Sequence, residues 1–82
     1  MDICAGGSIS VGATSITFKN DHNVDCTITS CELPGFPPPP VVIPAKSTRT
    51  VPLNPPPTVK GDYEYTPDCC GKKETNPVIK VQ

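Results

Sequence analysis

Prolines constrain the fold of this chain more than any other feature of its sequence. The 82 residues include twelve prolines, at positions 34, 37–40, 44, 52, 55–57, 67 and 77. Proline lacks the amide hydrogen that a helix interior needs, and its ring collides with the preceding helical turn. The stretches between the prolines carry no 3.6-residue apolar period. We therefore expect a chain without long helices.

Short alternating runs rich in β-branched residues occupy the space between the prolines. Residues 15–19 place Ile16 and Phe18 on one face, and residues 26–30 do the same with Cys26 and Ile28. Similar runs, separated by Gly, Pro, Asn and Asp, lie at 9–11, 41–43, 47–53, 62–65 and 78–81. About seven strands at this spacing predict an all-β fold, a single antiparallel β-sandwich. With 35 % hydrophobic residues and no Trp, we expect residues 1–82 to form one domain with a modest core.

Charge and motif content argue against several classes of function. The net charge is −1, and no basic stripe alternates with aromatic residues, so we expect no nucleic-acid partner. No apolar run approaches the roughly 20 residues of a membrane helix, and we expect no membrane contact. The single histidine, His22, has no Ser or Cys with an acid arranged around it, and no Gly-rich phosphate loop is present. We therefore expect a protein that is not an enzyme.

Five cysteines in so short a chain indicate an oxidising compartment. The first residues lack the basic and apolar regions of a signal peptide. We expect a mature secreted or periplasmic fragment whose signal peptide is absent from this sequence, with Met1 added for expression. The alternative is a reduced, cytosolic, thiol-rich metal binder.

Five segments carry a family resemblance by their order and spacing: 16–20, 26–30, 43–47, 61–65 and 79–81. They resemble segments of small cupredoxins such as plastocyanin. Residues 16–20 resemble the family's second strand, which ends at an Asn, and residues 26–30 resemble a strand written His-Thr-Val-Thr-Ser in family members. Residues 43–47 resemble a later proline turn, and 61–65 with 79–81 resemble the last hairpin. The resemblance spans roughly residues 9–81 and implies a cupredoxin-like Greek-key sandwich.

The copper ligands of that family are not reproduced in this sequence. A type 1 copper site uses one His on the early strand and a Cys, a His and a weak Met on the last loop. Cys26 stands at the position of the early His. On the last loop, one alignment places Pro67, Cys70 and Lys73 at the Cys, His and Met positions. The other alignment places Cys69, Lys72 and Thr75 there. Neither contains the second His, so we do not expect a blue-copper electron carrier.

The resemblance brings Cys26 close to the Cys69-Cys70 pair at one end of the sandwich. Our first hypothesis is a disulfide from Cys26 to Cys69 or Cys70, worth roughly 3–4 kcal/mol on the chain-entropy model. Cys4 and Cys31 could form a second bridge, which leaves one cysteine free or paired between chains. The protein would then be a non-catalytic structural or binding module whose former copper end is closed by cysteine pairing.

Two further hypotheses remain open. In the first, Cys26, Cys69 and Cys70, with Cys31 or His22, bind Cu(I) or Zn(II) as thiolates, although adjacent cysteines on an extended strand point apart. His22 could join them only if its turn folds over the cysteines. In the second, the chain is an interaction domain that presents the proline loops 37–40 and 55–57 to an unknown protein partner.

Overall fold

The chain is all-β in the computed structural model, which describes residues 1–71 and 75–82. Within that part of the chain there are seven strands and no helix, as the prolines and the alternating runs predict. The strands are β1 (Gly7–Ile9), β2 (Ser15–Asn20), β3 (Cys26–Cys31), β4 (Val41–Ile43), β5 (Ser47–Pro52), β6 (Gly61–Pro67) and β7 (Val78–Val81).

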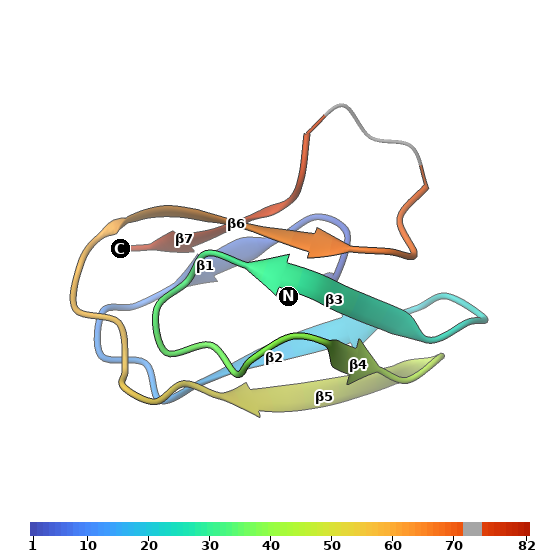
Figure 1. Cartoon of the computed structure of the whole chain (residues 1–82), viewed down its shortest axis with the longest axis horizontal. Helices are drawn as coiled ribbons and strands as arrows, with labels where there is room; N and C mark the ends of the chain where they lie inside the picture. Colours follow the sequence, from blue (N-terminus) through green and yellow to red (C-terminus); the bar gives the residue numbers. More distant parts are fainter. Residues whose placement is uncertain (72–74) are drawn as a thin grey trace.

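The strands form two sheets: in Figure 1, β6, β7 and β3 lie above β2 and β5, and β4, at the edge of the larger sheet, lies beside β5. The larger sheet has the order β1-β7-β6-β3-β4, and the smaller sheet pairs β2 with β5. Because β1 pairs with β7 in parallel, the larger sheet is mixed, and the expectation of a purely antiparallel arrangement was wrong. The remaining strand pairs are antiparallel.

The parallel pair arises from the path of the N-terminal arm, residues 1–5. The arm runs beside β2, where the Ile3 amide donates to the Lys19 carbonyl at 3.0 Å and the Lys19 amide donates to the Met1 carbonyl at 2.8 Å. The chain then turns at Gly6, whose φ is 72°. A Cβ at this glycine would overlap the carbonyl oxygen of Val78, so only glycine fits there. After the turn the chain joins the other sheet as β1.

The inner faces of the two sheets share one hydrophobic core. Phe18 of the smaller sheet meets Tyr65 of the larger sheet edge to face, with ring centroids 5.4 Å apart. The Tyr65 hydroxyl donates to the Ile3 carbonyl at 2.8 Å and so holds the arm against the core. Burial raises the pKa of that phenol, which stays protonated. The buried hydrophobic residues are Ile3, Ile16, Phe18, Cys26, Ile28, Leu33, Val41, Ile43, Val51, Leu53, Tyr65, Ile79 and Val81.

The strand directions divide the connections between two opposite ends of the molecule (Figure 1). One end, called the cysteine end below, holds the 21–25 turn, the 44–46 turn and the bend 68–70 after β6. The other, called the proline end, holds the connections 10–14, 32–40 and 53–60. Both proline tracts lie in connections, as expected, and both of these connections are at the proline end.

Candidate functional site at the cysteine end

Two disulfides fasten the cysteine end. Cys4 is bonded to Cys70 with their Cα atoms 5.5 Å apart, and Cys26 is bonded to Cys69 with a Cα separation of 5.1 Å. Cys26 begins β3 and is fully buried, whereas Cys69 and Cys70 follow β6. The bond from Cys26 goes to one of its two expected partners.

Reciprocal hydrogen bonds hold Cys69 beside Cys26. The Thr27 amide donates to Oδ1 of Asp68 at 2.8 Å, and the Asp68 amide donates to the Thr27 carbonyl at 3.0 Å. Each bond joins the residue next to one cysteine to the residue next to the other. The bend after β6 is therefore fixed to the start of β3 by one side-chain and one backbone hydrogen bond as well as by the disulfide.

The expected bridge between Cys4 and Cys31 was wrong. Cys31 is the last residue of β3, five residues beyond Cys26. A strand rises about 3.3 Å per residue, which places Cys31 about 16 Å from Cys26 and from the cysteine end. Cysteines whose Cα atoms are more than about 7 Å apart cannot be bridged without backbone movement. Cys4 therefore pairs with Cys70, and Cys31 is the cysteine left over.

Cys31 lies against the core as a half-buried thiol. It is placed opposite Tyr65 in the pairing of β3 with β6. Burial is the main cause that raises its pKa; a hydrogen bond with the Leu33 backbone offsets part of this, and the nearby Glu32 carboxylate adds to it. The side chain is thus a protonated thiol at neutral pH and a poor nucleophile.

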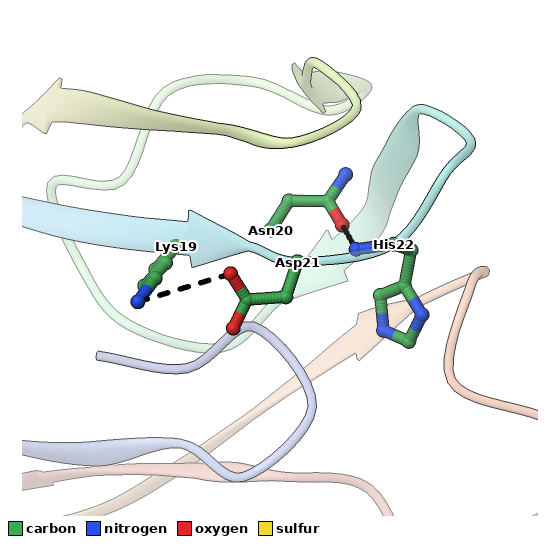
Figure 2. Close-up of polar contacts among 4 residues, drawn as sticks. All are labelled: Lys19, Asn20, Asp21 and His22. Carbon is green, nitrogen blue, oxygen red and sulfur yellow. Dashed lines mark hydrogen bonds and ion pairs between the residues drawn. The ribbon is translucent and has the colours of Figure 1, made fainter.

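His22 is positioned by the buried side chain of Asn20 (Figure 2). The His22 amide donates to Oδ1 of Asn20 at 2.9 Å. The Asn20 Nδ2 lies within 3.2 Å of the carbonyl oxygens of Val24, Ile43 and Pro44. Asn20 has no exposed surface, and its bonds tie the 21–25 turn to the 44–46 turn. The neighbouring ion pair between Lys19 and Asp21 is exposed at 3.8 Å and contributes little to stability.

The imidazole of His22 reaches the sulfur atoms. In Figure 2 it points away from the Asn20 amide, and its Nε2 lies 3.3 Å from Sγ of Cys4. The Sγ atoms of Cys69 and Cys70 are 3.8 Å apart. Donor atoms of four residues all lie within 4.8 Å of one another, and we call this group the Cys–His cluster: Cys4, His22, Cys69 and Cys70. The turn does fold over the cysteines, the condition under which His22 could serve as a ligand.

The cluster differs from the expected metal set at one position. Three of the expected residues, His22, Cys69 and Cys70, do come together. Cys26 is bonded to Cys69 and does not belong to the cluster, whereas Cys4 does. Sequence reasoning missed Cys4 because the arm before β1 has no alternating pattern that would place it beside β2. The ligand positions assigned by alignment to Lys72 and Lys73 lie outside the described residues.

No protein-family model, curated protein or solved structure matches this chain. The cupredoxin resemblance therefore rests on the segments quoted above and on nothing external to the sequence. In the described part of the chain, no helix is long and apolar enough to cross a membrane.

Proposed function

We propose that this protein is a non-catalytic structural or binding module, a cupredoxin-like Greek-key β-sandwich whose former copper end is closed by disulfides. It would act outside the cytosol, in a secreted or periplasmic setting. The observation that carries the proposal is the convergence of both disulfides at one end, where they join the N-terminal arm, β3 and the bend after β6. The placement of β3 beside β6 supports it further, since the resemblance requires Cys26 to face the last loop.

The energetics of the crosslinks support an oxidising location. The two disulfides span sequence separations of 66 and 43 residues. On the chain-entropy model each is worth about 4 kcal/mol. A domain of this size has a total stability of roughly 4–12 kcal/mol. The crosslinks therefore supply a large share of the stability, and a reducing cytosol would remove it.

Thiol counting combined with metal analysis tests this proposal. We expect one reactive thiol in denatured, freshly isolated protein and five after reduction, with no stoichiometric copper in the oxidised protein. We also expect export to an oxidising compartment to give folded protein, and cytosolic expression in a strain with intact thiol reductases to give unstable protein. Five thiols before reduction, in a protein that is equally stable from both routes, would refute it.

A second candidate function is protein interaction through the first proline tract. Pro38, Pro39 and Pro40 are exposed between β3 and β4. The second tract is more closely packed: Pro57 is buried and Pro56 is half-buried, although Pro55 is exposed, and 55–57 line a hollow of about 230 Å³ with Pro34 and Tyr63. The first tract is thus the more accessible of the two to a partner with an aromatic groove.

A panel of purified aromatic-groove domains tests the interaction. We expect at least one domain to bind the native protein and to lose binding when Pro38 and Pro39 are replaced by Ala. Replacement of Pro57 by Ala, at the buried proline of the second tract, is the control and should leave binding unchanged. Absence of binding across the panel, or equal loss in both variants, would count against this candidate.

A further inference from the structure

The Cys–His cluster contains one group that the disulfides do not need, the imidazole of His22. The bond that Asn20 makes to this turn goes to the backbone amide of His22, so it does not require a His side chain. The ring nevertheless extends to Sγ of Cys4, at 3.3 Å. A disulfide sulfur carries no hydrogen, so in the oxidised protein Nε2–H donates to it, a weak bond. The same nitrogen is a strong ligand for zinc when deprotonated.

Two of the spacings between donor atoms already come close to those of a tetrahedral metal site. Two sulfurs at about 2.3 Å from a tetrahedral zinc lie about 3.8 Å apart, and a sulfur and a nitrogen about 3.5 Å apart. The Sγ atoms of Cys69 and Cys70 are 3.8 Å apart, and Sγ of Cys4 is 3.3 Å from Nε2 of His22. Adjacent cysteines point apart on an extended strand, but Cys69 and Cys70 lie in the bend after β6, so that objection does not apply.

We propose that reduction of both disulfides converts the Cys–His cluster into a site for one Zn²⁺, with three thiolates and one imidazole as ligands. This donor set is typical of closed structural zinc sites. The zinc site and the Cys4–Cys70 disulfide cannot exist together, because sulfurs bonded to each other are not available as thiolate ligands. The sequence prediction of Cys26 as a ligand is replaced by Cys4.

A dithiol reductant supplies the electrons and protons that this conversion needs. Each protein disulfide accepts two electrons and two protons, and the dithiol loses its two S–H bonds and forms one S–S bond. Zinc then displaces the three thiol protons of Cys4, Cys69 and Cys70 into solvent, while the imidazole proton moves from Nε2 to Nδ1. The Sγ atoms of Cys4 and Cys70 separate by side-chain rotation, for which a Cα separation of 5.5 Å leaves room. Cys26 is released as a thiol.

The metal would take over the crosslink that reduction removes. Its ligands come from the N-terminal arm, the 21–25 turn and the bend after β6, all at the cysteine end. Because the reduced chain loses most of its stability, metal binding is coupled to folding. The reduced, metal-free chain should therefore refold when zinc is added.

Titration of the full chain, reduced by a phosphine under anaerobic conditions, tests the proposal. With Co²⁺ as the probe we expect one equivalent to bind, with the thiolate charge-transfer and intense visible bands of tetrahedral cobalt, and Zn²⁺ to displace it. Circular dichroism should show recovery of the native β signal as metal is added. The oxidised protein should bind neither metal.

Matched variants decide which residues hold the metal. Loss of an outer-shell partner alone costs 10–100-fold in affinity, so His22→Asn and Cys4→Ser should each weaken zinc binding by at least about 100-fold. Cys31→Ser removes a cysteine without removing a ligand and should bind as the native chain does. Cys26→Ala removes a buried thiol that is not a ligand and should keep the visible bands of tetrahedral cobalt at saturating metal. Several results would overturn the proposal: no binding by the reduced chain, binding without refolding, affinity unchanged in His22→Asn and Cys4→Ser, or loss of the cobalt bands in Cys26→Ala. Tight Cu(I) binding with no zinc binding would overturn it as well.

Discussion

The two ends of this molecule are closed by different means. At the cysteine end, two disulfides and the buried Asn20 side chain join the N-terminal arm, the two turns and the bend after β6. At the proline end, connections rich in proline meet through backbone bonds, from Asn54 N to the Gly35 carbonyl at 2.9 Å and from Gly12 N to the Pro57 carbonyl at 2.8 Å. The stability of one end thus depends on redox state, and that of the other depends on backbone conformation.

Reduction of the disulfides, which acts at the cysteine end, should lower the free energy of unfolding more than any of the substitutions below. With each crosslink worth about 4 kcal/mol, we expect chemical denaturation in a phosphine reductant to show a loss of most of the free energy of unfolding. The paired variants Cys4→Ala/Cys70→Ala and Cys26→Ala/Cys69→Ala should each lose about 4 kcal/mol on their own. The second pair should lose somewhat more, because Cys26 is fully buried. A reduced protein as stable as the oxidised one would mean that the cysteine end does not depend on its crosslinks.

The Asn20→Ala substitution should have the next largest effect, again at the cysteine end. It removes contacts to three carbonyl oxygens and leaves the His22 amide without its acceptor. We expect a loss of about 2–4 kcal/mol in the free energy of unfolding, measured with the disulfides intact. Lys19→Ala, which removes only an exposed ion pair, is the control and should cost less than about 0.5 kcal/mol. Equal effects would show that the Asn20 contacts do not hold this end together.

Glycine substitutions test the proline end separately. Gly35 and Gly12 both have a φ of 85°, which disfavours any residue with a Cβ. At Gly35 an added Cβ would also overlap the Pro55 carbonyl oxygen, whereas at Gly12 it would meet nothing within 4 Å. We expect Gly35→Ala to cost about 2–3 kcal/mol and Gly12→Ala about 1 kcal/mol in thermal or chemical unfolding. Similar costs for both variants would indicate that the two proline-rich connections are not closely packed.

Cys31, the cysteine on the proline side of β3, should give the smallest effect. Its raised pKa means that its stabilising contribution is complete below the pKa of an unfolded thiol and is lost as pH rises toward the folded value. We expect Cys31→Ala to flatten part of the alkaline loss of stability, and alkylation of the native thiol near pH 8 to be slower than that of a free cysteine. Rapid alkylation at neutral pH would contradict the burial of this thiol.

The parts of the fold that local patterns encode could be predicted. Ile16 with Phe18 and Cys26 with Ile28 alternate with polar residues, and all four are buried as expected. The parallel pairing of β1 could not be predicted, because the path of the arm depends on long-range contacts at Gly6 and Tyr65. For the same reason Cys4 was assigned the wrong partner. Cys69 and Cys70 come close because the chain bends after β6. An interpretation that treats them as part of an extended strand does not predict this bend.

Peptide mapping of the native protein tests the central claim most directly. Trypsin leaves Cys69 and Cys70 together in 61–72, Cys4 in 1–19, and Cys26 with Cys31 in 20–46. After alkylation in denaturant without reduction, we predict one species that joins all three peptides, lighter than their sum by four hydrogens and carrying one alkyl group on Cys31. Fragmentation within 61–72 should then assign Cys69 to Cys26 and Cys70 to Cys4. A bridge that includes Cys31, or three separate peptides that are fully alkylated, would contradict the account.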